Sequence, residues 1–333
     1  MAVTSVQGSR LEWIDWMKAI GIYLVVLGHF DSYGNDLIYA FHMPLFFIIS
    51  GFLCKKEDNH VIFWKKLWFN LVVPMLIIAA VNFVYACILQ LIDGSFEFKT
   101  FYWFVRNVLF GMVSGFDYLW FVYTLILLKI IFQYCRSIVW FYALTVVMLT
   151  LAYIYNNYDL SAFPFFLNEP NAIVDVCMAY PFFALGILLH DYKAILKEWN
   201  HKGMLVLMGV CGFILVFICC SYNGSVGLHC CDYGGNMLLC LLGGISGSMM
   251  VFCFSKLQGH ASKYVVIISR GTIIILGFQK IVIALVRVFF PASYADIVFA
   301  VIIVILFIPL ILWTERYFPL MAGKYRINKI RPV

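Results

Sequence analysis

Three side chains near the N-terminus have the types and the spacing that group transfer with proton movement would need. Lys18 and His29 are eleven residues apart, which in an α-helix is close to three turns, so both project from one face about 16 Å apart along the axis. Asp15 lies three residues before Lys18, where it can pair with the ammonium group or orient it. This helix face thus has a cation near one end and an imidazole near the other. The plainer alternative is that Lys18 extends to a polar interface and His29 ends the helix.

A second histidine is expected at the same level as the first. The next apolar run begins Phe41-His42-Met43-Pro44, only a short link after His29, so the two helices are antiparallel and their imidazoles should lie at one depth. Two histidines at one depth suit proton transfer near neutral pH. Pro44 fits the first turn of a helix, and Ser50-Gly51 allows that helix to pack closely on a neighbour.

The elements that hold these residues are expected to be membrane-spanning helices. Of 333 residues, 64% are hydrophobic and 12% charged, and the mean hydropathy is +0.94. This leaves too little polar surface for a water-facing globule, so a soluble enzyme, a nucleic-acid binder and a secreted disulfide scaffold are excluded. The net charge of +6 alone implies no nucleic-acid partner. The 11 cysteines form no CxxC pair and indicate neither a metal site nor a disulfide framework, although Cys230 and Cys231, in a polar loop beside His229 and Asp232, leave that as a minority interpretation.

The apolar runs predict an all-α polytopic membrane protein with a single transmembrane domain over residues 1–333. A cleavable signal is not expected, because Met1 to Arg10 is polar. Between spans three and four, Phe101 to Val113 is apolar apart from Arg106 and Asn107 and is expected to lie in the interface or to dip partway in. About ten spans are predicted, at residues 14–30, 38–54, 67–91, 118–135, 138–155, 172–190, 203–221, 235–254, 264–289 and 296–313.

The distribution of charge predicts that both termini are cytoplasmic, since Lys and Arg accumulate on that side of short loops. With the N-terminus inside, the outer loops hold only Lys99 and Arg106 as basic residues. The predicted inner segments hold Arg10, Lys55, Lys56, Lys65, Lys66, Lys129, Arg136, Lys193, Lys197, Lys202, Lys256, Lys263, Arg270, Arg316, Lys324, Arg326, Lys329 and Arg331. The predicted outer loops hold Asp31, Asp36, Asp93, Glu97, Asp117, Asp159 and Glu169.

Other polar and aromatic side chains at the outer level are candidates for binding a second substrate. Lys280 and Arg287 share a helix face, and Asp175 is expected to neutralise one of them, while the other can hold an acidic sugar or a diphosphate. Internal ion pairing is the favoured interpretation of this set. Trp103, Trp120 and Tyr123 can stack on sugar rings, although aromatic residues at that depth are more often interface anchors.

Three segments resemble the membrane acyltransferase-3 family, most of all its branch related to fucose 4-O-acetylase. They are RLEWIDWMKAI from Arg10, VVLGH ending at His29, and IYAFHMPLFFIISGFL from Ile38 to Leu53. The family carries a basic residue, ten further residues and a histidine in its first span, which Lys18 and His29 match. It also has an FHMPLFF..SG motif, and an LWF motif that Leu119 to Phe121 match. The likeness covers roughly the first 55 residues and this short later motif.

The resemblance implies transfer of an acetyl or similar acyl group from cytosolic acyl-CoA to a hydroxyl of a cell-surface or lipid-linked glycan, in the plasma (cytoplasmic or inner) membrane. It makes His29 the catalytic histidine, with acetyl-CoA or another acyl-CoA as donor substrate and no bound cofactor or metal. Many relatives have a further histidine in a later segment, where this chain has Gln279. A glutamine can hydrogen-bond but cannot titrate, which puts proton transfer at that position in doubt.

These residues take the following expected roles. His29 is the general base, with His42 tuning it or stabilising the oxyanion, and a covalent acyl-histidine remains open. Lys18 with Asp15 is the donor-binding pair, because a pantetheine arm with its CoA phosphates near Lys18 would place the thioester near His29. Trp120, Arg106, Lys280 and Gln279 are the candidate acceptor-binding residues. The rival class is a multi-span transporter or flippase of glycan precursors or small anions, but the chain shows no pair of matching halves.

Overall fold

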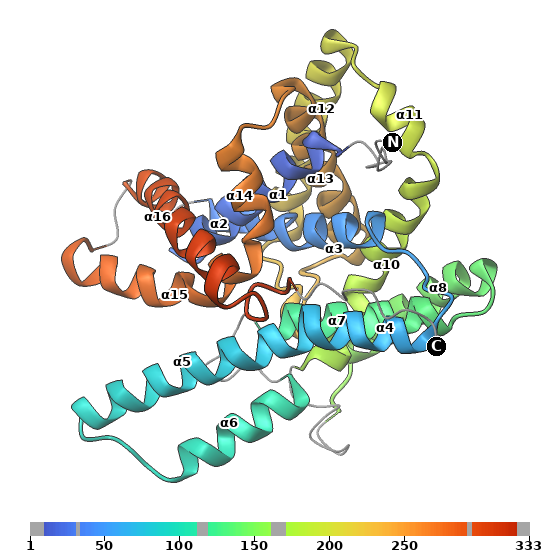
Figure 1. The fold of residues 1–333 in the computed structure, drawn as a ribbon. Coiled ribbons are helices and arrows are strands. Elements are labelled where there is room, and N and C mark those ends of the chain that lie inside the picture. Colours follow the sequence, from blue (N-terminus) through green and yellow to red (C-terminus); the bar gives the residue numbers. More distant parts are fainter. Residues whose placement is uncertain (1–9, 31–33, 112–118, 161–170, 292–294, 325–333) are drawn as a thin grey trace, which may run out of the picture.

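A computed structural model of the chain describes residues 10–30, 34–111, 119–160, 171–291 and 295–324. Within these ranges the chain is helical, with one isolated bridge between Gly227 and Asp232 and no strand. Figure 1 shows the helices, which are α1 (Glu12–Gly28), α2 (Asn35–Tyr39), α3 (His42–Phe52), α4 (His60–Leu67), the π-helix η1 (Trp68–Val72), α5 (Val73–Ile92), α6 (Lys99–Phe110), α7 (Leu119–Tyr134), α8 (Ile138–Asn157), α10 (Ala172–Asp191), α11 (Lys193–Glu198), α12 (Lys202–Asn223), the 3₁₀ turn η2 (His229–Cys231), α13 (Met237–Gln258), α14 (Lys263–Arg270), α15 (Thr272–Phe289) and α16 (Asp296–Tyr317).

Among the residues that the structure describes, eight helical segments are long and apolar enough to cross a membrane, so the protein is a multi-pass membrane protein. They are Asn35–Phe52, His60–Ile92, Ile138–Asn157, Ala172–Asp191, Lys202–Asn223, Met237–Gln258, Thr272–Phe289 and Asp296–Tyr317. The other two predicted spans coincide with α1 and α7, which have 17 and 16 residues. The count of ten and the cytoplasmic placement of both termini stay predictions.

Three predicted spans are interrupted, and each interruption has a local cause. The second divides between α2 and α3, where Phe41 leaves helical geometry with φ −140°. The third runs from α4 through η1 into α5, and Pro74, which has no N–H to donate, lies at the start of α5. The ninth divides at Gly271 into α14 and α15. The sequence pattern missed these breaks because hydropathy continues through them.

The predicted interfacial piece after the third span is an amphipathic helix, α6. It packs on α5, and Figure 1 shows the two as a hairpin that extends away from the other helices. Phe101 and Trp103 on α6 are exposed, as expected for a surface that contacts lipid. Val113, the predicted end of this piece, lies outside the described residues.

The helix α1 lies at the centre of the packing. It contacts α3, α13, α14, α15 and α16. Beside it, α3 and α10 approach very closely, because a Cβ atom at Gly51 would lie 2.1 Å from the Phe183 carbonyl oxygen and one at Gly186 would lie 2.1 Å from that of Ile48. This confirms the close packing predicted from Ser50-Gly51 and holds α3, with His42 at its start, in a fixed position.

Polar side chains connect the helices at both ends of α1. We call these the Arg10 end and the His29 end, after the residues next to the first and the last turn of α1. At the Arg10 end, Arg10 and Ser269 meet at Asp15. At the His29 end, the carbonyl oxygen of Phe30 accepts a hydrogen bond from Arg287. The segment formed by α14 and α15 therefore runs in the same direction as α1, as expected for two odd-numbered spans.

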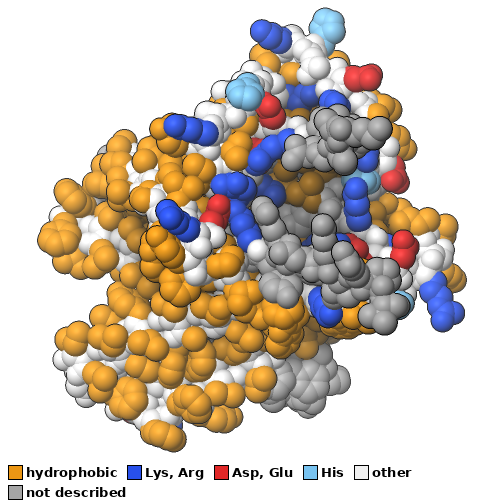
Figure 2. All heavy atoms as spheres, in the orientation of Figure 1, with side chains coloured by type: hydrophobic (Ala, Val, Ile, Leu, Met, Phe, Trp, Pro, Cys, Tyr) orange, Lys and Arg blue, Asp and Glu red, His pale blue; other side chains and the backbone are white. Residues whose placement is uncertain are grey.

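Basic side chains gather at the Arg10 end. Arg270 and Lys324 both pair with Glu315 there, and Figure 2 shows Lys and Arg over the centre and upper part of one face, whereas its lower and left margins are hydrophobic. Six of the charged residues on which the predicted orientation depends lie outside the described residues, namely Asp31, Asp117, Glu169, Arg326, Lys329 and Arg331.

Candidate active site

His29 is the C-cap residue of α1, and the helix backbone sets the state of its ring. Its Nδ1 lies 2.7 Å from the Val25 carbonyl oxygen. Because a carbonyl oxygen only accepts, Nδ1 carries the hydrogen, and Nε2 is the nitrogen that can take up a proton or act as a nucleophile. The amide nitrogen of Gln279 lies 3.4 Å from the same Nδ1. The structure therefore places Gln279, at which the resemblance implies a histidine in many relatives, next to His29.

His42 repeats this arrangement at the first residue of α3. Its Nδ1 donates to the Ile38 carbonyl oxygen at 2.8 Å, and its side chain is buried. The Tyr39 ring packs edge-on against it, with ring centroids 5.0 Å apart. Both predicted histidines thus expose the same ring nitrogen for chemistry.

His29 and His42 line one cavity of about 540 Å³ at the His29 end. Its walls come from α1, α2, α3, α7, α15 and the loop between α12 and α13. Trp120, Lys280 and a third histidine, His229, also line it. Six separate elements thus surround the two predicted histidines, and we call this space the histidine cavity.

Two further cavities lead from the histidine cavity toward the Arg10 end. The middle cavity, of about 270 Å³, is lined by Lys18 and Lys129 and shares Val25 and Phe121 with the histidine cavity. The basic cavity, of about 340 Å³, is lined by Lys55 and Lys66 and shares Leu71 and Lys129 with the middle cavity. The three adjoin one another in a series, of which α1 lines the histidine cavity and the middle cavity. Lys18 makes no hydrogen bond or ion pair with any residue that the structure describes.

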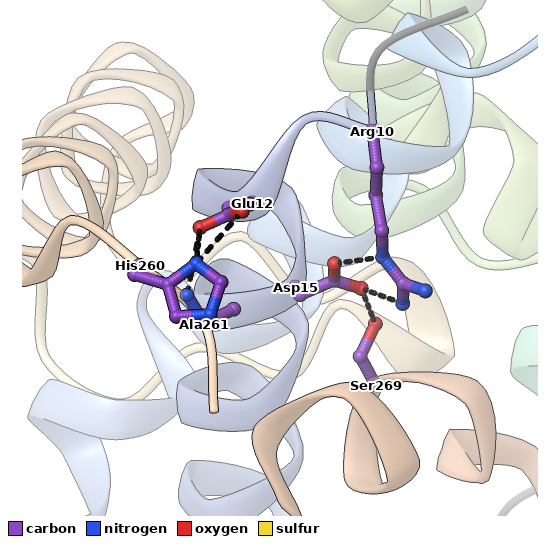
Figure 3. Close-up of polar contacts among 6 residues, drawn as sticks. All are labelled: Arg10, Glu12, Asp15, His260, Ala261 and Ser269. Carbon is purple, nitrogen blue, oxygen red and sulfur yellow. Dashed lines mark hydrogen bonds and ion pairs between the residues drawn. The ribbon is translucent and has the colours of Figure 1, made fainter. Parts of the chain in front are cut away.

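Asp15 does not form the ion pair with Lys18 that its spacing allows. Figure 3 shows its carboxylate held by Arg10, through contacts of 2.6 and 2.9 Å, and by the Ser269 hydroxyl at 2.6 Å. Nearby, Glu12 accepts from His260 and from the Ala261 backbone. Asp15 is buried with its oxygens occupied and lines none of the three cavities described above. Its partner is Arg10 rather than Lys18 because Arg10 precedes the helix and can fold back onto it.

The expected pairing of Asp175 with Lys280 or Arg287 is wrong. Arg287 forms a two-pronged ion pair with Asp296 at the start of α16, with both contacts at 2.8 Å. Asp175 instead accepts from His229 Nδ1 at 2.7 Å and from the Cys230 backbone N–H at 3.0 Å. Internal ion pairing was the correct interpretation of Arg287, but with a carboxylate on another helix.

The loop that carries His229 is held in an unusual conformation. Cys230 and Cys231 both have positive φ angles, 76° and 57°, which for residues other than glycine cost of order 1–3 kcal/mol each and often mark functional positions. Paired backbone hydrogen bonds between Gly227 and Asp232, at 2.9 and 3.0 Å, close the loop. Both cysteines are free. Burial, with Asp175 and Asp232 nearby, raises the pKa of Cys230 to about 11.

The predicted acceptor-binding residues fall into two groups. Trp120 and Lys280 line the histidine cavity, and the Trp120 ring stacks on His229 with centroids 5.0 Å apart. Arg106 lies on α6, where its guanidinium covers the Trp103 ring, and it lines none of the three cavities. Tyr123 donates to the Val108 carbonyl oxygen. Arg106 and Trp103 are thus separate from the described site.

Sequence reasoning missed two lining residues for identifiable reasons. The sequence indicates Lys129 only as an inner charge, although on α7 it lines the middle cavity together with Lys18. His229 was considered only for metal binding beside two cysteines. One sequence feature could have indicated His229. Asp175 is a carboxylate inside a predicted span and lies at the same level as this loop histidine, so the two could have been predicted to pair.

An all-helical membrane domain that encloses a histidine-lined chamber, reached through lysine-lined cavities, is suited to a membrane enzyme that handles an anionic donor. The chain belongs to the acyltransferase-3 family, since the family described as "Acyltransferase domain" matches residues 11–316. No curated protein and no solved structure matches the chain. The family match confirms a membrane acyltransferase and favours an enzyme over a transporter or flippase. The narrower likeness to the fucose 4-O-acetylase branch stays a prediction.

Proposed function

We propose that the protein is an O-acyltransferase of the plasma membrane that moves an acetyl or similar acyl group from cytosolic acyl-CoA to a hydroxyl of a cell-surface or lipid-linked glycan. The observation that carries this proposal is the series of three adjoining cavities, from the lysines of the basic cavity to the histidine cavity. Such a series suits a donor whose anionic end stays at one membrane face while its acyl end reaches the other.

The donor end is supported by the lysines. Lys55 and Lys66 line the basic cavity, and Lys18 and Lys129 line the middle one, so phosphate groups entering from the Arg10 end meet cations at successive depths. From Lys18 to His29 the helix rises about 16 Å, a length comparable to a pantetheine arm. The thioester would then lie in the histidine cavity.

The chemistry requires a base for the acceptor hydroxyl and a donor for the tetrahedral oxyanion. His29, with Nδ1–H fixed on Val25, acts through Nε2, either as the base that takes the hydroxyl proton or as the nucleophile that carries the acyl group. His42 supports it in the same cavity. Trp120 offers an aromatic face and Lys280 a cation to the acceptor glycan.

The test uses membranes that contain the protein, radiolabelled acetyl-CoA and glycan extracts. We expect label in the glycan fraction with the wild-type protein and none above background with His29→Ala. Label in the glycan at equal rates with both proteins, or no transfer with any glycan or acyl-CoA offered, would contradict the proposal.

A further inference from the structure

His229, which lines the histidine cavity, is paired with the buried carboxylate of Asp175. Asp175, in the first turn of α10, is fully buried, and its two oxygens accept from His229 Nδ1 and from the Cys230 N–H. A carboxylate bound to Nδ1–H holds the imidazole in one tautomer and stabilises its protonated form. Asp175 is thus placed to make His229 a proton acceptor.

The other ring nitrogen of His229 is available to a ligand. Nε2 is buried and has no hydrogen-bond partner among the described residues, which is costly unless a ligand or water fills that position. The ring lines the histidine cavity and is stacked on Trp120 with an interplanar angle of 19°. Its lone pair therefore has a fixed direction beside the aromatic side chain proposed to contact the acceptor.

The three histidines of this cavity differ in their partners. Nδ1 of His29 and Nδ1 of His42 contact backbone carbonyl oxygens, which are neutral. Only His229 has a carboxylate on Nδ1. Because an imidazolium gains more from a carboxylate than from a carbonyl dipole, His229 is the histidine best suited to take up a proton, and His29 is left to act as a nucleophile.

We propose that His229, positioned by Asp175, is the base for the acceptor hydroxyl, so that transfer proceeds in two steps through acyl-His29. In the first step His29 Nε2 attacks the thioester carbonyl carbon, the C–S bond breaks, and the CoA thiolate leaves and takes a proton from cytosolic water. In the second step the acceptor oxygen attacks the acyl carbon, its proton passes to His229 Nε2, and the C–N bond breaks to restore neutral His29. His229 then releases its proton to water, so the sum is ester plus CoA thiol. This inference rests on the proposed function.

The two steps can be measured separately without knowing the acceptor. Exchange of radiolabelled CoA into acetyl-CoA, with purified protein and no glycan, reports only the first step. Transfer of acetyl label to glycan, in membranes of the cells that make the protein, reports both. We expect wild-type protein to catalyse exchange, His29→Ala to lose exchange and transfer, and His229→Ala to keep exchange while transfer falls about 10²- to 10⁴-fold.

Asp175→Asn should also keep exchange and lose transfer, because an amide cannot stabilise the imidazolium. If Asp175 only stabilised the fold, its substitution would lower exchange and transfer together. His260→Ala is the matched control, since His260 also pairs with a carboxylate, Glu12, but lies at the Arg10 end outside the three cavities. It should leave both reactions near wild-type.

Three results would overturn the inference. They are normal glycan transfer by His229→Ala, loss of exchange together with transfer in folded His229→Ala, and absence of exchange in a wild-type protein that transfers acetyl to glycan. The last would leave the proposed function standing with a one-step mechanism. A wild-type protein that transfers nothing would instead reject the proposed function itself.

Discussion

A neutral imidazole can act through one nitrogen only when its other nitrogen is fixed as a donor, and the backbone of two helices provides this for His29 and His42. Each Nδ1 is bound to the carbonyl oxygen four residues earlier, at 2.7 and 2.8 Å. The two rings are therefore matched in tautomer and in cavity. They differ in that His29 follows α1, which also carries Lys18 of the middle cavity, whereas His42 starts α3.

His29→Ala is expected to insert normally and to lose acyl transfer by a factor of about 10² to 10⁴, more if the imidazole is acylated. His42→Ala should lose less, because its role is supporting. Transfer of labelled acetyl to glycan, normalised to folded protein by size-exclusion chromatography, measures both.

His190→Ala is the matched control for these variants. Its Nδ1 also donates to a backbone carbonyl, that of Phe52 at 2.7 Å, but it lines none of the three cavities. If His190→Ala loses as much activity as His29→Ala, the loss reports structure rather than chemistry. A larger loss in His42→Ala than in His29→Ala would exchange their roles.

Lys18→Ala is expected to weaken use of acyl-CoA by about 1.5 to 3 kcal/mol, the strength of a hydrogen bond to a charged group, and Lys18→Arg should restore much of it. The readout is kcat/KM for acetyl-CoA. Lys202→Ala, which removes an exposed lysine at the start of α12 outside the three cavities, is the control. Unchanged kcat/KM in Lys18→Ala would mean that Lys18 only extends toward the interface.

At the residue scale the sequence predicts members of the site better than their partners. Spacing and a motif indicate three side chains that line adjoining cavities in the structure. They are Lys18, His29 and His42. Asp15 and Asp175 were given wrong partners because helical spacing describes only neighbours on one helix. Asp15 is held by Arg10, which folds back onto α1, and by Ser269 of the distant helix α14. Asp175 is bound by His229, in a loop far along the chain.

At the scale of elements, the contact between α3 and α10 holds His42 and Asp175 in register. These helices meet through Gly51 and Gly186, where neither backbone leaves space for a side chain. The same α10 presents Asp175 to the loop between α12 and α13, and α3 presents His42 to α1. A shift between α3 and α10 would therefore move both sides of the histidine cavity.

Gly186→Ala is expected to destabilise the protein by about 1 to 3 kcal/mol, the usual cost of forcing a methyl group into a packed interface. Thermal unfolding in detergent measures this as a lower Tm. Gly203→Ala on α12, where a Cβ atom meets nothing within 4 Å, is the control and should be neutral or slightly stabilising. Equal Tm values for the two variants would show that α3 and α10 can separate without cost.

Cys230 is expected to resist alkylation at neutral pH, because burial raises the pKa of its thiol to about 11 and only the thiolate reacts. With this pKa, about one Cys230 thiol in a thousand is ionised at pH 8. The rate of its alkylation should therefore rise about tenfold per pH unit up to pH 10. Site-resolved mass spectrometry after iodoacetamide treatment measures it. Ser225→Cys, in the exposed part of the same loop, should react readily at pH 8, whereas an equally fast Cys230 would contradict the burial of this turn.

The elements themselves were largely predictable, and their interruptions were not. Each predicted span corresponds to a helix or a pair of helices, since runs of apolar residues report length and burial. The breaks at Phe41, η1 and Gly271 arise from backbone geometry within apolar sequence, which hydropathy does not register. The loop that carries His229 depends on two positive φ angles at cysteines, which no sequence rule assigns to that residue type.

At the scale of the whole molecule, the separation of charge follows the direction of the proposed reaction. The basic cavity and the ion pairs of Arg10, Arg270 and Lys324 lie at one end, and the histidine cavity lies at the other. If the Arg10 end is cytoplasmic, as the distribution of Lys and Arg predicts, donor entry and acyl transfer occur at opposite membrane faces.

This orientation and the number of crossings can be tested together. The helices α1 and α7, with 17 and 16 residues, rise about 24 to 26 Å, somewhat less than the hydrocarbon core of about 30 Å. If both cross, Lys65→Cys and an N-terminal tag lie in the cytosol and Asp159→Cys lies outside. If α7 did not cross, positions 65 and 159 would share a side, and if α1 did not cross, the N-terminus and position 65 would lie on opposite sides.

We expect a membrane-impermeant maleimide to label Asp159→Cys in intact cells and Lys65→Cys only after lysis, each compared with the parent protein and its native cysteines. Labelling of neither position in intact cells, or of both, would mean that they share a side and that α7 does not span the membrane. Labelling of Lys65→Cys alone would invert the topology and place the basic cavity away from cytosolic acyl-CoA.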